Sequence, residues 1–306
     1  MIAPRKIAII LLLTLSACAT YPDISQSRSP CRSEAGGWCA FVGDAAQDAF
    51  PYAVAATQAY TGDNDLYAWP LPMLEPLEKT PIPDDAAEKG FGYELFEQFA
   101  HDQYDPTRKP IARILAFRGT DFDGFSDIFY GTLRSDQIEL ALAAFETESA
   151  RFDDDIPWIV TGHSLGGALA TEVSIQNPEV RAYMFNTSPF YGGDGMTNDT
   201  QRTVFNERGE VLRRFARYDA APAAEVFTIN CGPQNGTFTK HRIRLLADCI
   251  TWIAAYRSKD AHAMVAAQGI SKPMVECGPA GKVHPGPGFR QLEPCVHQGR
   301  RPRDDG

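Results

Sequence analysis

The sequence lacks a hydrophobic run long enough to cross a membrane. The longest apolar stretch in the 306 residues, Ile7 to Leu15, has about nine residues. As a helix it would span about 14 Å of a hydrocarbon core about 30 Å thick. Apolar residues make up 44% and charged residues 22% of the chain, which is ordinary for a globular protein. Together these features exclude a multispan membrane protein and a chain that is disordered throughout.

The sequence also lacks an excess of positive charge. Lysine and arginine number 29 against 39 aspartates and glutamates, so the formal net charge is −10. No stripe of basic residues stands out, and no internal repeat is present. An acidic chain of this kind does not suit a polyanionic partner, so we expect no binding to nucleic acid.

The N-terminus has the pattern of an export signal. Arg5 and Lys6 precede the apolar run, and the small residues Ser16 and Ala17 precede Cys18. This order is typical of a secretory signal peptide, and its end resembles a bacterial lipoprotein signal, in which the cysteine is lipidated and becomes the first residue of the mature chain. We therefore expect residues 1–17 to be removed, with an ordinary signal cleaved nearby as the alternative.

Export of this kind has consequences for charge and location. Loss of two basic residues with the signal would take the formal charge from −10 to −12, so anchoring would depend on acyl chains and not on attraction to anionic lipid. Ala19, not aspartate, follows Cys18. The resemblance to lipoproteins implies that the chain is lipid-anchored in the cell envelope, at the outer membrane of a Gram-negative bacterium.

The cysteines lack the spacing of a metal site. No C-x2-C pair is present, and no histidine stands at ligand spacing from two cysteines, which argues against zinc. Without Cys18, six of the seven cysteines remain, and an even number in an exported protein indicates disulfides, with 15 possible full pairings. The pairing of sequence neighbours, which we favour among these, is Cys31–Cys39, Cys231–Cys249 and Cys277–Cys295.

Short apolar runs alternate with helical patterns through the middle of the chain. We expect strands at 93–100, 111–117, 156–160, 180–185 and 211–215. We expect helices at 45–60, starting or kinked at Pro51, from Ser135, at 165–176 and at 241–256. This alternation predicts an α/β fold, with a mostly parallel central sheet flanked by helices in three layers. We place a tether at 18–44, the main domain at 45–262 and a Pro/Gly-rich tail at 263–306.

The most informative motif is Gly162-His163-Ser164-Leu165-Gly166, between an expected strand and an expected helix. A strand-to-helix turn of this type strains the serine backbone, so the residues two positions away must be small. The helix N-terminus adds positive potential and N–H groups, of which that of Leu165 would be an oxyanion donor. The motif predicts Ser164 as a nucleophile lifted out of the sheet, with His163 packing beside it. A glycine-rich turn with an idle serine is the alternative.

A second motif supports this interpretation. The apolar run from Leu115 ends in Arg118-Gly119-Thr120, about 40 residues before the sequence GHSLGGALA at 162–170. Together, the two segments resemble the class 3 lipases, α/β-hydrolases that act on acylglycerols and phospholipids. The resemblance covers roughly residues 45–258. It implies that Thr120 supplies a second oxyanion donor and that Asp127 is structural.

A serine hydroxyl needs a histidine base and a carboxylate that orients it. In α/β-hydrolases the three follow in the order serine, acid, histidine. The expected strand at 211–215 leads into Asp219-Ala-Ala-Pro, similar to the family's Asp-x-Val-Pro, so we predict Asp219 as the acid. Asp194 and Asp199, in a Gly-rich loop, are weaker candidates.

Four histidines lie beyond Asp219. His241 starts an amphipathic helix, and members of the family often carry the catalytic histidine just ahead of such a helix. We therefore predict His241 as the base, with His262 as the alternative, while His284 and His297 lie in the tail.

The resemblance implies a hydrolase of the triacylglycerol lipase or phospholipase A type, which works through an acyl-enzyme without a cofactor or metal. A short-chain esterase, a thioesterase or an acyltransferase would have the same motifs. A non-catalytic envelope lipoprotein on a hydrolase scaffold is the alternative outside the enzymes. The sequence names no protein partner.

Overall fold

A seven-stranded sheet forms the centre of the computed structural model, which describes residues 26–60, 65–100, 108–119, 135–214, 222–277 and 285–295. The strands lie side by side in chain order, so that each one pairs with the next. Their bounds are β1 (Leu74–Leu77), β2 (Tyr93–Phe99), β3 (Pro110–Phe117), β4 (Trp158–His163), β5 (Arg181–Phe185), β6 (Arg202–Glu207) and β7 (Glu225–Ile229). The first three are antiparallel, and β3 to β7 are parallel.

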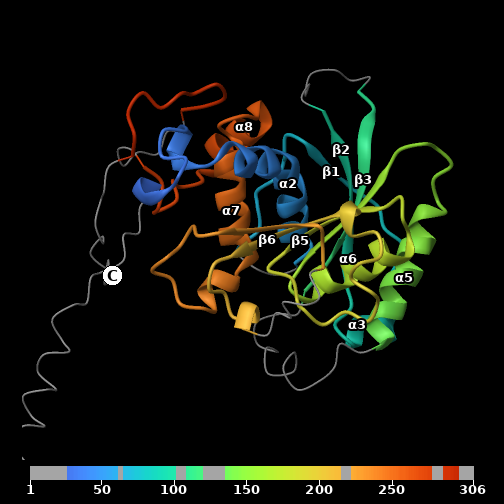
Figure 1. Cartoon of the computed structure of the whole chain (residues 1–306). Helices are drawn as coiled ribbons and strands as arrows, with labels where there is room; N and C mark the ends of the chain where they lie inside the picture. Colours follow the sequence, from blue (N-terminus) through green and yellow to red (C-terminus); the bar gives the residue numbers. More distant parts are fainter. Residues whose placement is uncertain are drawn as a thin grey trace, which may run out of the picture.

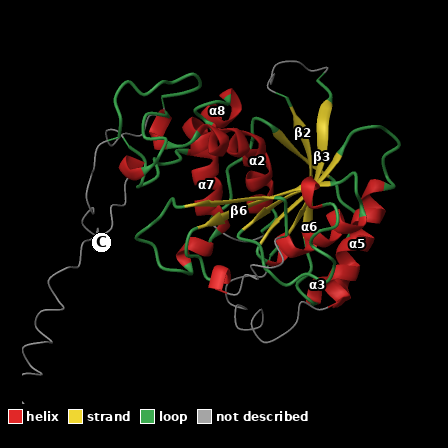
Figure 2. Ribbon diagram, viewed as in Figure 1, coloured by secondary structure: helices red, strands yellow, loops and turns green. Residues whose placement is uncertain are grey.

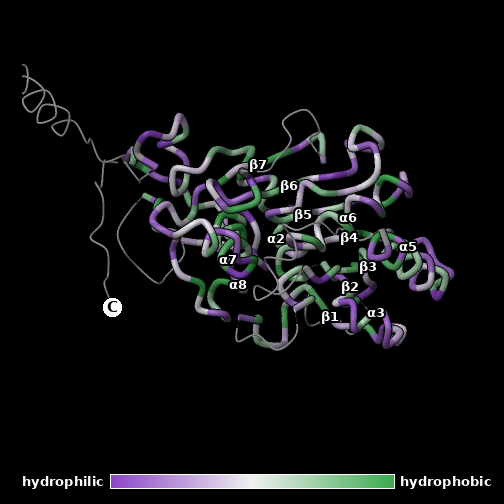
Figure 3. The backbone as a smooth tube through the Cα atoms, turned by 90° about the horizontal axis from the view of Figure 1, so that it is seen from below, coloured by the Kyte–Doolittle hydropathy of each residue, from purple (hydrophilic) through white to green (hydrophobic). Residues whose placement is uncertain are grey.

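Helices cover both faces of this sheet (Figures 1 and 2). On one face lie α2 (Ala40–Gln58) and α7 (Ile243–Ala254), with α8 (Lys259–Gln268) packed on α7. On the other face lie α3 (Asp84–Glu88), α5 (Ser135–Ser149) and α6 (Leu165–Gln176). Figure 3 shows the strands between the layer with α2, α7 and α8 and the layer with α5 and α3.

The strand sequences explain the two cores. Successive residues of a strand point to opposite faces, and in β3 Ile114 belongs to the α2–α7 core while Leu115 belongs to the α5–α6 core. Both side chains are fully buried, as the unbroken apolar run predicts. The three layers confirm the predicted α/β-hydrolase fold. In the described ranges, no helix combines the length and the apolar character needed to cross a membrane.

Most of the expected elements are present within a few residues, but one prediction is wrong. A strand was expected at 211–215, but its described part, 211–214, does not form one, because Leu212–Arg214 is the short 3-10 helix η5. The strand in this part of the chain is β6, at 202–207, which pairs in parallel with β5. Val211 and Leu212 are buried, so their apolar character reflects burial in a turn.

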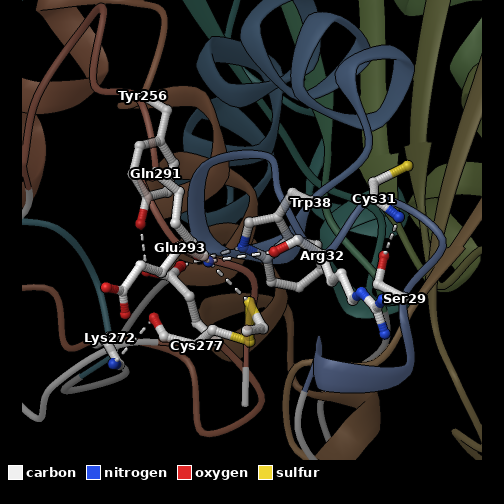
Figure 4. Close-up of a disulfide and its surroundings, with 11 residues drawn as sticks. Ser29, Cys31, Arg32, Trp38, Tyr256, Lys272, Cys277, Gln291 and Glu293 are labelled. Atoms are coloured by element: carbon white, nitrogen blue, oxygen red, sulfur yellow. Dashed lines mark hydrogen bonds between the residues drawn. A yellow bond between two sulfur atoms is a disulfide. The ribbon is translucent and has the colours of Figure 1, made fainter.

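The first and last described segments of the chain, which fall within the expected tether and tail, pack against each other. We call residues 26–39, 270–277 and 285–295 the terminal cap. Its two ends are joined by backbone hydrogen bonds from Gln26 N to Val275 O (2.8 Å) and from Cys295 N to Arg32 O (2.9 Å). Figure 4 shows Gln291, whose side chain donates a hydrogen bond to the Arg32 carbonyl at 3.2 Å.

Disulfides secure both the cap and the main domain. Cys31–Cys39 and Cys277–Cys295 lie in the cap, and Cys231–Cys249 joins the segment after β7 to α7. These are the three pairings that we favoured from the sequence.

A buried carboxylate links the cap to the main domain. Glu276 Oε2 accepts hydrogen bonds from the indole N–H groups of Trp38, at 3.1 Å, and Trp252. The Tyr256 hydroxyl donates to Oε1 of the same side chain. Burial raises the pKa of Glu276.

Candidate active site

The turn between β4 and α6 holds Ser164 in a strained conformation. Its φ is 56° and its ψ is −122°, a region that residues with a side chain rarely adopt. A Cβ on Gly162 would lie 2.3 Å from the Gly166 carbonyl oxygen, and a Cβ on Gly166 would lie 2.2 Å from the Phe117 carbonyl oxygen. Because backbone surrounds both positions, only glycine fits there.

Ser164 lies at the N-terminus of α6, but it is not open to solvent. Leu165 is the first residue of the helix, so no residue within that helix can accept its N–H. Only 1% of the Ser164 surface is exposed. The hydroxyl was expected to be presented for attack. In this structure it faces a neighbouring imidazole, and the residue is almost completely buried.

That imidazole belongs to His241, in the 3-10 helix η6 (Thr239–His241) just before α7. Its Nε2 lies 3.1 Å from Ser164 Oγ, and its Nδ1 lies 2.8 Å from Glu210 Oε2. A carboxylate oxygen accepts, so Nδ1 carries the hydrogen and the lone pair of Nε2 faces the serine hydroxyl. This is the tautomer that a general base needs.

The carboxylate beside the base follows β6. The Leu212 N–H donates to Glu210 Oε2 at 2.8 Å, which orients the group from a second direction. Burial raises the pKa of Glu210 and lowers the pKa of His241, because each loses the hydration of its charged form. The imidazole is therefore neutral at neutral pH and able to accept a proton.

The structure brings together only some of the residues singled out from the sequence. Ser164 and His241 are in contact, whereas His262 lies in α8, beside Gly286 of the terminal cap. Glu210 had not been singled out, although its place after β6, in a turn with Gly209, fits the rule that the acid ends a strand after the elbow. The predicted residues outside the described ranges are Cys18, Thr120, Asp127, Asp219, His284 and His297.

His163 is buried against the His241 ring, as its expected packing role requires, and it also makes two hydrogen bonds. Its Nδ1 lies 2.7 Å from the Tyr60 hydroxyl, and its Nε2 lies 2.6 Å from the carbonyl oxygen of His241. Burial, and then the neighbouring His241, lower the pKa of His163 far below its usual value. A neutral ring therefore lies behind the base.

The arrangement has the groups required for acyl transfer. A hydroxyl, an imidazole and a carboxylate are joined by two hydrogen bonds, beside the positive end of a helix. Within the described ranges, no three histidine, cysteine, aspartate or glutamate side chains are grouped as a metal site would require.

The chain is similar to solved fungal structures at low identity. A mutant form of MDLA from Penicillium cyclopium is 14% identical, with 67% of this chain and 86% of that chain covered and a TM-score of 0.40. Lipase II from Rhizopus niveus is 16% identical, with 55% and 74% covered and a TM-score of 0.36. No protein-family model and no curated protein matches the chain. Similarity at this level carries no argument about function, which depends on the side chains of the site.

Proposed function

We propose that this protein is a serine hydrolase that cleaves carboxylic esters of lipids. The observation that carries the proposal is the position of the His241 ring, with one nitrogen 3.1 Å from Ser164 Oγ and the other 2.8 Å from Glu210 Oε2. This is the constellation by which a hydroxyl becomes a nucleophile at neutral pH.

Acylation is the first half of the proposed reaction. Ser164 Oγ attacks the ester carbonyl carbon, and its proton passes to His241 Nε2. The oxygen of the tetrahedral intermediate receives a hydrogen bond from the Leu165 N–H. As the carbon–oxygen bond breaks, the alcohol takes the proton from Nε2 and leaves an acyl-enzyme. Water then attacks the carbonyl carbon of the acyl-enzyme, with His241 again taking and returning the proton. This step releases the carboxylic acid and restores Ser164.

Glu210 takes the role that the sequence suggested for Asp219. Its carboxylate holds the imidazole by Nδ1 and stabilises the imidazolium during turnover. The order serine, acid, histidine is kept as Ser164, Glu210, His241. A Thr120 N–H as the second oxyanion donor stays a prediction; each such donor lowers the barrier by about 2.7–4 kcal/mol.

The setting of the site supports an apolar ester as substrate. Phe190, in the segment after β5, and Phe238, just before η6, expose 43% and 53% of their surfaces. Exposed aromatic rings on the segments that hold the site can contact acyl chains. A short-chain esterase or thioesterase would use the same three residues, and a profile of rates against acyl length separates these activities.

Two assays of one pair of variants test the proposal. The wild type should react with a fluorophosphonate probe and hydrolyse p-nitrophenyl esters, with a preference for longer acyl chains. Ser164→Ala should do neither. Ser149→Ala, at the end of α5, is the control and should match the wild type. A wild type that neither reacts nor hydrolyses would point to a non-catalytic scaffold.

We also propose that Cys18 carries the lipid that anchors the protein in the outer membrane. The support is the signal-like N-terminus alone. Radiolabelled palmitate should enter the wild type and not Cys18→Ala, and the variant should leave the membrane fraction. Equal labelling of the two would refute the assignment.

A further inference from the structure

We propose that His163 and Asn186 are positioning residues that hold the main chain of His241, so that its ring bridges Ser164 and Glu210. The inference depends on the proposed function, because it assigns these residues a role in that same site. Its basis is the set of hydrogen bonds at one carbonyl oxygen.

The carbonyl oxygen of His241 receives donors from the ends of two parallel strands. His163, the last residue of β4, places Nε2 at 2.6 Å from it. Asn186, directly after β5, places Nδ2 at 3.3 Å, and the same amide lies 3.1 Å from the Lys240 carbonyl oxygen. The short helix that carries the base is therefore tied to the sheet on which the nucleophile is built.

The chemistry of this contact defines the tautomer of His163. A carbonyl oxygen can only accept, so Nε2 must carry the hydrogen. Nδ1 then accepts from the Tyr60 hydroxyl at 2.7 Å. Burial keeps the ring neutral by lowering its pKa, and a neutral ring does not repel the imidazolium that forms on His241 during turnover.

Asn186 is itself fixed in place by its backbone conformation and its hydrogen bonds. Its φ is 41°, a left-handed conformation that asparagine tolerates better than most residues. Its N–H donates to the Phe205 carbonyl at 2.9 Å, and its Oδ1 accepts from the Glu207 N–H at 2.8 Å. The side chain therefore connects β5, β6 and the base, and both of its polar atoms are engaged.

The connection matters because His163 is the chain neighbour of Ser164. A hydrogen bond from residue 163 to the main chain of residue 241 sets the distance between nucleophile and base. A misplacement of about 1 Å in such a pair can cost about a hundredfold in rate. If His163 served only to fill space, the identity of its polar atoms would not matter.

Two substitutions at position 163 separate these roles. A glutamine amide nitrogen reaches the place of Nε2, so His163→Gln keeps a donor for the His241 carbonyl. The shorter amide of His163→Asn reaches only the place of Nδ1. We expect His163→Asn to lower kcat roughly 10- to 100-fold with KM unchanged within about twofold, and His163→Gln to regain most of the loss. Equal kcat values for the two variants, whether high or low, would overturn the proposal.

Asn186→Asp supplies a second test that does not depend on His163. It keeps the acceptor for the Glu207 N–H but loses the donor, and it sets a carboxylate against two carbonyl oxygens. The rate of fluorophosphonate labelling at Ser164 should fall about tenfold or more. The rate is measured on folded variant protein, identified by its cooperative thermal unfolding. An unchanged rate would contradict the role assigned to Asn186.

A readout without turnover distinguishes this inference from the proposed function. In proton NMR, the Nδ1–H of His241, which faces Glu210, should give a low-field signal in the wild type and in His163→Gln, and a weakened signal in His163→Asn. A wild type with this pattern but no hydrolysis would overturn the proposed function alone. A hydrolytic wild type with the same signal in both variants would overturn the positioning role alone.

Discussion

Two buried glutamates show how similar surroundings lead to different roles. Glu210 and Glu276 are each about 1% exposed, and burial raises the pKa of both. Glu210 faces an imidazole and a backbone N–H. Glu276 faces two indoles and a phenol where the terminal cap meets the main domain.

The difference lies in the partner, not in the carboxylate. An imidazole gains and loses a proton near neutral pH, whereas indole and phenol donors keep theirs. A carboxylate against an imidazole can therefore stabilise the charge that the ring gains during proton transfer, while one against fixed donors can only hold segments together. A raised pKa alone would have indicated a functional site at both glutamates equally.

The largest effect that we expect separates the two glutamates by activity. Glu210→Gln should lower kcat about 1,000- to 10,000-fold, because an amide cannot hold the required tautomer or stabilise the imidazolium. Glu276→Gln should leave kcat within about twofold. Steady-state hydrolysis of a p-nitrophenyl ester measures both.

Asp219→Asn is the matched control for the acid. It should retain activity when Glu210→Gln has lost it. The reverse result would restore the prediction made from the sequence and remove Glu210 from the mechanism.

The second effect compares the disulfides of the two regions. Cys231–Cys249 encloses the segment that carries His241, while Cys277–Cys295 closes a loop of equal sequence separation, 18 residues, in the cap. Replacing either pair by alanines should lower the free energy of unfolding by about 3 kcal/mol. Only the first replacement should also lower kcat, because it loosens the support of the base.

Urea unfolding measures the loss of stability in each double variant. Steady-state kinetics at a temperature where both variants are folded measures kcat. Equal kcat values for the two double variants would show that the disulfide does not support the base.

The third effect concerns the cap alone. Glu276→Ala removes the acceptor of three buried donors, so we expect the free energy of unfolding to fall by about 2 kcal/mol. Activity per folded molecule should not change. Denaturant unfolding checks the first statement and active-site titration the second, and a parallel loss of active sites would show that the cap supports the catalytic residues.

The smallest effect is a dependence of stability on pH. The pKa of Glu276 is raised above its ordinary 4.5, so between the two values the folded state binds more protons than the unfolded state. Stability should therefore fall as pH rises through this window, by at most about 1.4 kcal/mol per pH unit. Glu276→Gln should flatten the curve, and an identical slope in variant and wild type would show that this carboxylate does not titrate there.

The elbow could be predicted from sequence because its constraints are local. Gly162 and Gly166 are required by backbone contacts within one turn, so the motif predicts the geometry. His241 was predicted from its place ahead of an amphipathic helix. The almost complete burial of Ser164 was not, because burial depends on segments far apart in the chain.

Glu210, which we propose as the acid, was not predicted because β6 does not look like a buried strand. It begins with Arg202 and ends with Asn206 and Glu207, and all three are buried. Arg202 donates hydrogen bonds to the carbonyl oxygens of Pro222 and Gly195, which no sequence pattern reveals. With this strand unrecognised, the rule for locating the acid was applied to the apolar residues 211–215 and led to Asp219.

The chain-order arrangement of the strands also bears on how the protein is made. Each strand can pair with the strand that precedes it in the chain, so the sheet can grow in chain order as the protein folds. Helix α2 cannot complete its packing in the same way, because it packs on α7, which lies much later in the chain. Its alanine-rich face, with Val54 and Ala55 fully buried in the folded protein, is covered completely only once α7 has packed on it.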